Sequence, residues 1–362
     1  MMIDTDPIAL FFGTRPQVIK ASVLREALGS VGPVVVVDTG QHYDYELHQV
    51  HYDQLGVGPP DAYLGVGSGS HGQQTATILA AAAGWIREHR PRMAVVIGDT
   101  NSTLACALAA AKERVPVAHV EAGLRATDLL MAEEINRRCV DAIASFLFAP
   151  SRRAEETLRR ERVDGDIHRV GDVAYDVLKR ALRRAPVSPL VDGEYVYATL
   201  HRAELVDEPL LLRKVVAALD ALPLPVLFAA HPRTTEAVRR ATCTPTERVR
   251  MSEPLGYLDS VAALRGASAV VTDSGGIQRE AYWLGIPCVT VRAETEWIET
   301  VECGANRLVS PKAPQGHLSD AVTDALTTRG CEWDVTHYGD GRAAERVAAV
   351  LAEATLGARS SS

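Results

Sequence analysis

Short apolar runs alternate with amphipathic stretches along nearly the whole chain. Strands that are buried on both faces are continuously apolar, so this alternation is typical of parallel β-sheets covered by helices on both sides. We expect strands of a first set at residues 8–12, 34–39, 93–98, 115–121, 146–149 and 167–170. We expect strands of a second set at residues 195–200, 226–229, 249–251, 269–272 and 288–291. The pattern therefore predicts an α/β chain with two doubly wound, Rossmann-like domains in tandem.

The stretch between the two sets is predicted to be a linker. A basic helix at residues 177–184 runs into Pro186 and Pro189, which interrupt regular structure. The 362 residues suffice for two domains that each bury a core. We therefore expect an N-terminal domain at residues 1–182, a C-terminal domain at residues 190–340, and a last helix within residues 341–358 that packs back on the first domain.

The charge balance and the cysteines argue against several classes of protein. The 38 basic and 46 acidic residues give a net charge of −8, and no basic block occurs, so we expect neither a nucleic-acid nor a membrane partner. The six cysteines form no Cys-x-x-Cys pair, which argues against a disulfide framework or a metal site and favours a cytoplasmic location. An acidic start, and no apolar run of roughly 20 residues, predict neither export nor membrane insertion.

Ligands of open parallel sheets bind just outside the carboxyl ends of the strands, so residues that follow strands are candidates for function. After the first strand, Gly13 permits a turn and Pro16 suits the first helical position, which puts Arg15 at a helix N-terminus. A cation at the positive end of a helix dipole suits an anion site, although an exposed Arg in such a turn is also common. Lys20, four residues after Pro16, belongs to the same site or is simply solvated.

Two further strands of the first domain each end in a carboxylate. Asp99 follows the third strand and Glu121 ends the fourth. Helix capping explains Asp99 on its own. Glu121 ends an apolar strand, so we expect it to be partly buried, which requires either a partner or a chemical role.

The motif Glu133-Glu134-Ile135-Asn136-Arg137 lies in the next predicted helix. Acidic side chains in a first helical turn are stabilised by the helix dipole. Arg137 lies four residues after Glu133, so an intrahelical ion pair explains both residues without a catalytic role.

Histidines follow two strands of the second domain, His201 after the first and His231 after the second. A histidine in isolation is usually structural. Two histidines at neighbouring strand ends favour a role in chemistry or in phosphate binding.

The strand at residues 269–272 turns through Ser274, Gly275 and Gly276 directly into a helix. Such a turn directs backbone N–H groups and a hydroxyl group toward an anion, which predicts a phosphate cradle. Tight packing is the alternative explanation of the glycine pair. Glu280, one helical turn further on, is placed to reach a ribose diol.

Residues 67–72 match the Gly-x-Gly-x-x-Gly pattern of dinucleotide-binding proteins. We expect no strand before them and find no acidic ribose-binding residue in a βαβ context, so we interpret them as a loop. A nicotinamide mechanism is therefore not supported, and we expect no cofactor.

In this order, the motifs resemble the UDP-N-acetylglucosamine 2-epimerases of the non-hydrolysing type over nearly the whole chain. The matching blocks are residues 12–20, 39–42, 98–100, 119–125, 133–137, 201–202, 231–232, 273–278 and 338–342. The resemblance implies the GT-B arrangement, in which two Rossmann-like domains face a cleft. It also implies a UDP-sugar as the substrate and a homodimer as the common assembly.

The resemblance further implies roles for single residues. The acid/base residues would be Asp99, Glu121, Glu133 and His201, the last of which either moves a proton or contacts phosphate. The substrate-binding residues would be Arg15, Lys20, Arg137, His231, Ser274, Gly275 and Gly276, with Glu280 on the ribose. UDP would leave the anomeric carbon as the C2 proton departs, and would return after the glycal is reprotonated from the opposite face. The sequence does not decide which carboxylate removes the proton.

Several positions depart from the usual family pattern. These are Ala132, Leu205, Arg279 and the pair Trp297-Ile298, where the family usually has Pro, Asn, Glu and Arg-Pro. The loss of polar groups at Leu205 and Trp297 predicts altered sugar recognition or an altered fate of the intermediate. Tyr43 and Asp44 follow the Gln41-His42 pair and put in question the activation by a second substrate molecule that occurs in bacterial relatives.

Three alternatives to the epimerase hypothesis use the same fold. A hydrolysing relative would let water capture the intermediate and release free N-acetylmannosamine and UDP. A retaining glycosyltransferase needs long acceptor-binding loops, whereas the loops here are short, and a catalytically inactive sensor leaves the carboxylates without a purpose. The 33 Arg among 38 basic residues favour a GC-rich bacterial genome. A specialised antibiotic or secondary-metabolite pathway, acting on a modified UDP-sugar, is compatible with the altered positions.

Overall fold

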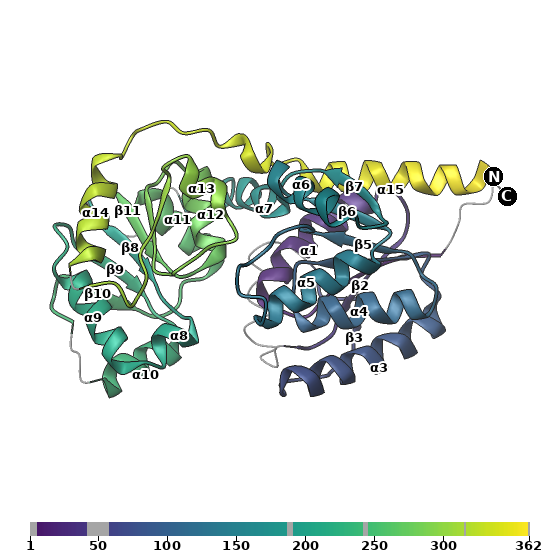
Figure 1. The fold of residues 1–362 in the computed structure, drawn as a ribbon, viewed down its shortest axis with the longest axis horizontal. Coiled ribbons are helices and arrows are strands. Elements are labelled where there is room, and N and C mark those ends of the chain that lie inside the picture. Colours follow the sequence, from purple (N-terminus) through teal and green to yellow (C-terminus); the bar gives the residue numbers. More distant parts are fainter. Residues whose placement is uncertain (1–5, 42–57, 187–190, 242–244, 315, 361–362) are drawn as a thin grey trace. The chain divides into compact units, whose positions relative to one another are not determined.

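The computed structural model describes residues 6–41, 58–186, 191–241, 245–314 and 316–360 (Figure 1). The chain forms two compact units. Unit 1 comprises Met1–Lys179 together with Thr336–Ser362, and unit 2 comprises Arg180–Val335. Unit 2 is therefore an insertion in the chain of unit 1. Among the described residues, no helix is both long and apolar enough to cross a membrane.

Unit 1 contains a seven-stranded parallel sheet in the order β3-β2-β1-β4-β5-β6-β7. Its strands are β1 (Ile8–Phe12), β2 (Val34–Asp38), β3 (Ala62–Tyr63), β4 (Met93–Ile97), β5 (Val117–Val120), β6 (Phe146–Ala149) and β7 (Asp166–Arg169). Its helices are α1 (Arg15–Leu28), α3 (His71–His89), α4 (Asn101–Lys112), α5 (Ala132–Ile143), α6 (Arg152–Glu161), α15 (Ala343–Ser360) and most of α7 (Val173–Leu182), with the short η1 (Thr336–Tyr338) before α15.

Unit 2 contains a six-stranded parallel sheet in the order β10-β9-β8-β11-β12-β13. Its strands are β8 (Val196–Thr199), β9 (Val226–Ala229), β10 (Val249–Ser252), β11 (Ala269–Thr272), β12 (Cys288–Thr290) and β13 (Asn306–Leu308). Its helices are α8 (Ala203–Val206), α9 (Pro209–Asp220), α10 (Pro232–Arg240), α11 (Tyr257–Gly266), α12 (Gly275–Trp283), α13 (Ile298–Glu302) and α14 (His317–Thr327).

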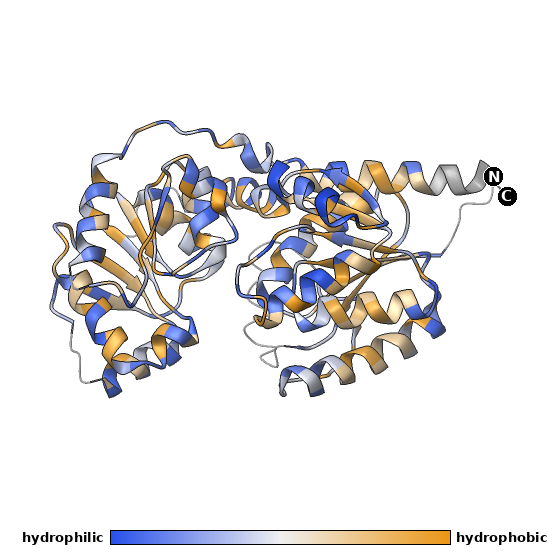
Figure 2. Cartoon of the chain, viewed as in Figure 1, coloured by the Kyte–Doolittle hydropathy of each residue, from blue (hydrophilic) through white to orange (hydrophobic). Residues whose placement is uncertain are grey.

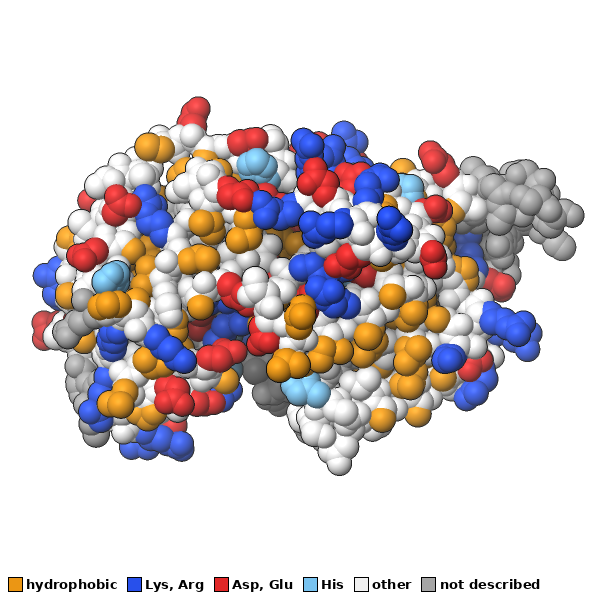
Figure 3. Space-filling model, viewed as in Figure 1, with side chains coloured by type: hydrophobic (Ala, Val, Ile, Leu, Met, Phe, Trp, Pro, Cys, Tyr) orange, Lys and Arg blue, Asp and Glu red, His pale blue; other side chains and the backbone are white. Residues whose placement is uncertain are grey.

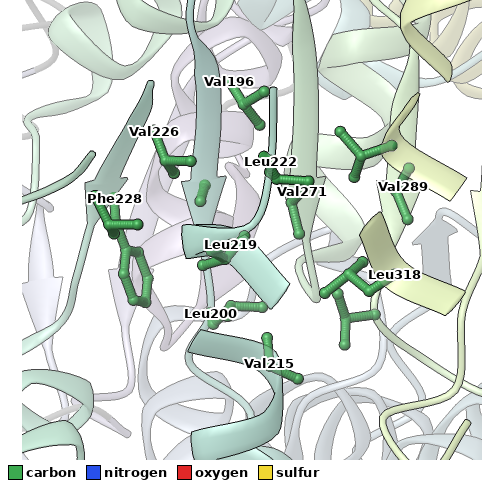
Figure 4. Packing of buried hydrophobic residues seen from close by; sticks show 14 of the residues in the cluster. Val196, Leu200, Val215, Leu219, Leu222, Val226, Phe228, Val271, Val289 and Leu318 are labelled. Atoms are coloured by element: carbon green, nitrogen blue, oxygen red, sulfur yellow. The ribbon is translucent and has the colours of Figure 1, made fainter. Parts of the chain in front are cut away.

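The central strands of each sheet are largely hydrophobic, whereas most hydrophilic residues lie on the surrounding helices and loops (Figure 2). All five residues of β1 and all five of β4 are buried. In unit 2, Val196, Phe228 and Val271 of the sheet pack with Leu219 of α9 and Leu318 of α14 (Figure 4). Burial of these strands on both faces explains why the apolar runs identified them, and the predicted α/β fold with parallel sheets is confirmed.

The sequence pattern missed two strands, β3 and β13. Each lies at the edge of its sheet and is only two or three residues long. Edge strands bury less side-chain surface than central ones, and β13 carries the polar Asn306 and Arg307, so neither strand contains an apolar run. The expectation that no strand precedes residues 67–72 was wrong, because β3 ends at Tyr63. The strand was missed because it contains no apolar run.

Helix α15 belongs to unit 1, although it follows unit 2 in the chain. It packs against α1 and buries Ala344, Val347 and Leu351. The carboxylate of Asp176 on α7 accepts hydrogen bonds from the backbone N–H groups of Ala343 and Ala344, at 3.0 and 2.9 Å. These contacts attach the start of α15 to the body of unit 1.

Candidate active site

The order of strands reverses between β1 and β4 in unit 1, and between β8 and β11 in unit 2. The loops that leave neighbouring strands in opposite directions open a crevice at such a switch point. The candidate residues follow these strands or their neighbours.

Asp99 and Glu121 follow the adjacent strands β4 and β5, which pair with Ile97 opposite Val120. The N–H of Gly98 donates to the carbonyl of Val120 at 2.8 Å. A Cβ atom on Gly98 would lie 3.3 Å from Oε2 of Glu121. The Glu121 carboxylate thus lies against the residue that precedes Asp99, and the structure brings the two acidic positions to one edge.

Glu121 is buried, with 7% of its surface exposed, and is paired with Lys20 of α1. The Lys20 ammonium lies 2.6 and 2.7 Å from the two carboxylate oxygens. Glu121 also has a φ of +70°, a left-handed conformation that is unfavourable for a residue with a Cβ atom. Strain of this kind persists only where surrounding contacts enforce it, and it occurs preferentially at functional sites.

The position of Asp99 in the sequence had suggested that it caps α4, but it does not. Thr100 is the N-cap, and its side chain accepts from the N–H of Thr103 at 3.3 Å. The Asp99 carboxylate pairs with Arg137 of α5, and its side chain is 31% exposed. Asn136 donates to the Asp99 carbonyl at 2.9 Å. Two residues of α5 thus hold Asp99, one at its carboxylate and one at its backbone carbonyl. Because the side chain remains partly exposed, the carboxylate is available to a ligand.

The two glutamates at the start of α5 differ sharply in environment. Glu133 is exposed in the first turn. Glu134 is fully buried and accepts from Arg137 at 2.7 Å, from Arg138 at 2.7 Å and from the N–H of Ala126 at 2.8 Å. Arg137 therefore pairs three residues back, with Glu134, and across to Asp99, rather than four residues back as its spacing had suggested.

Gln17 holds the loops after β1 and β4 together, a function that its sequence context did not reveal. Its Oε1 accepts from the N–H groups of Gly13 and Thr14, at 3.0 and 3.1 Å. Its Nε2 donates to the carbonyl of Ile97 at 2.6 Å. Gly13 is required in this turn, because a Cβ atom would lie 2.1 Å from the hydroxyl oxygen of Ser102.

His119 of β5 is buried, and its two ring nitrogens each contact an acceptor. Its Nδ1 lies 2.7 Å from Oδ1 of Asp141, and its Nε2 lies 2.7 Å from the carbonyl oxygen of Gly98. The other Asp141 oxygen accepts from Arg125 at 2.7 Å. Burial alone raises the pKa of Asp141, but the hydrogen bonds and charges of His119 and Arg125 outweigh this effect, so its pKa lies below the usual range.

The substitution Asp141→Asn is expected to lower the free energy of unfolding by about 3 kcal/mol at pH 7, because it leaves buried His119 and Arg125 without their shared anion. Asp141 has a depressed pKa in the folded state, so its contribution is present above about pH 4 and is lost as the pH falls through the folded value. Urea unfolding of both proteins should therefore give free energies that converge as the pH falls below about 4. Glu156→Gln removes an exposed ion pair with Arg152 and serves as the control, with an expected loss below about 0.5 kcal/mol. Equal stabilities of wild type and Asp141→Asn at pH 7 would contradict the expectation.

Arg15, at the start of α1, is half-buried, and this burial lowers the pKa of its guanidinium. It lies in unit 1, whereas the other predicted diphosphate ligands lie in unit 2. Its membership of one clamp with them stays a prediction. The expectations for His42, Tyr43 and Asp44 fall outside the described residues.

The Ser274 turn of unit 2 leads directly into α12. Ser274 is the N-cap, and its hydroxyl oxygen accepts from the N–H of Ile277 at 3.4 Å. Gly275 and Gly276 are the first two helical residues, so their N–H groups have no carbonyl partner within the helix. Gly276 has space at its Cα, because an added Cβ would meet Ser274 Oγ at 3.7 Å, an ordinary contact. Packing within the chain therefore does not require a glycine at position 276.

His201 follows β8, and its Nδ1 lies 3.0 Å from Oδ1 of buried Asp273, the residue after β11. His231 follows β9, is exposed and caps α10, where its Nδ1 accepts from the N–H of Arg233 at 3.2 Å. Capping accounts for His231 without a ligand, and the phosphate role remains a prediction.

Glu280 is nearly buried in the second turn of α12. Its Oε1 accepts from the hydroxyl of Tyr257 at 2.9 Å. Burial, together with the negative charge of Glu280, raises the pKa of Tyr257 well above its ordinary value, so the phenol remains a donor. Tyr257 thus orients Glu280, and nothing in its local sequence had indicated this.

Two of the departures from the family pattern touch each other. The Arg279 guanidinium lies over the Trp297 ring, 3.8 Å from its centroid. Arg279 Nε donates to the carbonyl of Gly275 at 3.1 Å, and a Cβ on Gly275 would lie 3.3 Å from the Trp297 indole nitrogen. Arg279 and Trp297 therefore form a cation–π pair that packs against Gly275 in the Ser274 turn. Leu205, by contrast, packs into the hydrophobic core of unit 2.

A family model described as UDP-N-acetylglucosamine 2-epimerase matches residues 31–352. The UDP-2,3-diacetamido-2,3-dideoxy-D-glucuronate 2-epimerase of Pseudomonas aeruginosa is 40% identical over 359 residues, which cover 96% of this chain and 99% of that protein. The UDP-N-acetylglucosamine 2-epimerase of Methanocaldococcus jannaschii is 35% identical over 363 residues, which cover 95% and 98%. The crystal structure of the M. jannaschii enzyme in complex with UDP-GlcNAc and UDP matches with a TM-score of 0.87 and 35% identity, covering 95% and 99% of the two chains.

Proposed function

The chain belongs to the UDP-N-acetylglucosamine 2-epimerase family, and from this membership we propose that it inverts C2 of UDP-GlcNAc to give UDP-ManNAc by elimination and re-addition of UDP. The family resemblance of the motifs is confirmed, and so is the implied fold of two Rossmann-like α/β units, which matches the solved structure of a family member. The observation that carries the proposed chemistry is the placement of Asp99 and Glu121 on adjacent strand ends, each beside its own cation.

The C2 hydrogen is only weakly acidic, because C2 is not adjacent to a carbonyl, so the reaction needs positioned acid/base groups. A base alone therefore faces a large pKa mismatch, which the departure of UDP from C1 relieves as negative charge collects on the diphosphate. Asp99, Glu121, Glu133 and His201 are the proposed acid/base residues. The Lys20 ammonium lies 2.6 Å from the Glu121 carboxylate, and the two side chains are 12% and 7% exposed, which supports a role for this pair in the chemistry.

The diphosphate needs donors that are already in place when charge develops on it. The N–H groups of Gly275 and Gly276 and the Ser274 hydroxyl stand at the positive end of α12, which supports their assignment to the leaving group. Arg15 and His231 would add to this clamp. The buried Glu280, held by Tyr257, would accept hydrogen bonds from the ribose hydroxyls.

A second candidate substrate follows from the P. aeruginosa relative. The name of that protein describes a UDP-sugar that also carries an acetamido group at C2, and that differs from UDP-GlcNAc by an acetamido group at C3 and a carboxylate at C6. Epimerisation at C2 is common to both activities. We therefore propose C2 epimerisation of a UDP-2-acetamido sugar as the reaction, with UDP-GlcNAc as the first substrate to test.

Proton NMR of UDP-GlcNAc incubated with the protein in deuterated water tests the proposal. We expect deuterium at C2 and new UDP-ManNAc signals, because the glycal is reprotonated from solvent-exchanged acid groups. Equal amounts of free N-acetylmannosamine and UDP, without UDP-ManNAc, would instead identify a hydrolysing enzyme. Binding of UDP-GlcNAc without deuterium uptake would identify a sensor, or an enzyme for the diacetamido uronate, and the same experiment with that substrate separates the two.

We propose a cytoplasmic enzyme that acts as a homodimer and needs no nucleic acid, membrane or cofactor. An apolar surface over α3 and α4 supports the dimer (Figure 3). Within α3, Ala76 and Ala80 are exposed, and within α4, Leu104 and Leu108 are half-buried. A bacterial origin and a role in an antibiotic pathway remain proposals that rest on the arginine content and the altered positions.

A further inference from the structure

Asp273 joins the ends of the two strands at the switch point of unit 2. It follows β11 and is fully buried, while His201 and Arg202 follow the neighbouring β8. Its Oδ2 accepts from the N–H of His201 at 2.9 Å and from the N–H of Arg202 at 2.8 Å. One carboxylate oxygen therefore fixes the backbone of the loop that carries the histidine.

The second oxygen of Asp273 faces the imidazole ring of the same histidine. Oδ1 is inaccessible to solvent and lies 3.0 Å from His201 Nδ1, but accepts no hydrogen bond in this orientation of the ring. The His201 side chain is 52% exposed. A buried carboxylate oxygen needs a donor, and Nδ1–H can supply one.

The charge state of Asp273 agrees with this geometry. Burial alone raises the pKa of the carboxyl, but His201 and the two backbone N–H groups outweigh burial, and the pKa of Asp273 lies below its usual range. The group is thus an anion whose Oδ2 accepts two backbone hydrogen bonds and whose Oδ1 faces His201 Nδ1. An anion at Nδ1 keeps the ring proton on that nitrogen and leaves Nε2 as the available lone pair.

We propose that Asp273 is a positioning residue that fixes the tautomer and the direction of the His201 ring, so that Nε2 is presented to the reacting sugar-nucleotide. The inference rests on the proposed function for the identity of that ligand. Carboxylate–histidine pairs of this kind hold catalytic imidazoles in other enzymes, where the carboxylate orients the ring and stabilises its protonated form.

The substitution Asp273→Asn tests the proposal. Its side-chain oxygen can still accept from the two backbone N–H groups, but its amide donates to Nδ1 and so moves the ring proton to Nε2. We expect kcat to fall about 10- to 100-fold while KM changes less than about threefold. In the His201→Asn background the same substitution should cost less than about twofold, because no ring remains to be oriented. An equal loss in both backgrounds would overturn the proposal and assign Asp273 a purely structural role.

The imidazole tautomer is a readout that does not depend on turnover. Proton–nitrogen correlation spectra of the wild-type protein labelled with ¹⁵N-histidine, assigned with His201→Asn, should show neutral His201 protonated at Nδ1. A proton at Nε2 in the wild type would overturn the proposal even if Asp273→Asn fails to fold. Absence of turnover on either UDP-sugar, with Nδ1 protonated, would contradict the proposed function and leave the positioning of His201 by Asp273 supported.

Discussion

The substitution Glu121→Gln is expected to lower kcat by about 10²-fold or more while UDP affinity changes less than about threefold. The amide has the same size but cannot take a proton from C2. Glu121 lies in unit 1, whereas all of the proposed phosphate donors except Arg15 lie in unit 2, so nucleotide binding should survive. Steady-state kinetics and calorimetric titration with UDP measure the two quantities.

A control is needed because the substitution Glu121→Gln would leave Lys20, which is also largely buried, without its anion. The double variant Glu121→Gln/Lys20→Met removes the unpaired charge and should restore thermal stability without restoring kcat. Glu113→Gln, which affects the 3.5 Å pair with Arg87, is the matched surface control and should leave both parameters unchanged. If kcat and UDP affinity fell together in Glu121→Gln, Glu121 would be structural rather than an acid/base group. Asp99→Asn is tested in the same way.

The substitution Gly276→Val is expected to weaken UDP binding by about 10²-fold or more, because the branched side chain would occupy the space that the diphosphate needs beside the N–H groups. The fold should tolerate the change, since a Cβ at this position meets only Ser274 Oγ at 3.7 Å. Gly84→Val is the control: Gly84 lies in α3, and nothing lies within 4 Å of its added Cβ. Both proteins should melt within a few degrees of wild type, and only Gly276→Val should lose the calorimetric signal. Retained affinity would refute the phosphate cradle.

The sequence predicted the strand ends because parallel strands that are buried on both faces leave continuous apolar runs. The apolar runs that end before Gly98 and at Val120 therefore located Asp99 and Glu121. The pairing of β4 with β5 places these two residues at one edge of the sheet. The short edge strands β3 and β13 left no such run. Local pattern thus identifies central strands and the residues that follow them.

The partners of these residues could not be predicted, because each comes from a distant part of the chain. Lys20 meets Glu121 across 101 residues, and Tyr257 meets Glu280 across 23. Spacing along a single helix was also misleading, since the fully buried Glu134, not the exposed Glu133, takes up Arg137. Side-chain burial and contacts between elements, which local pattern does not encode, decide such pairings.

The position of α15 has a consequence for how the protein forms on the ribosome. Residues 336–362 complete unit 1 only after the whole of unit 2 has been made. Until then the apolar face of α1 that α15 covers has no partner, while unit 2 already holds a complete sheet. Unit 2 is therefore free to fold during synthesis, and unit 1 reaches its final packing last. Before α15 is made, the incomplete unit 1 is an aggregation-prone intermediate, and its lifetime depends on how fast residues 336–362 are translated.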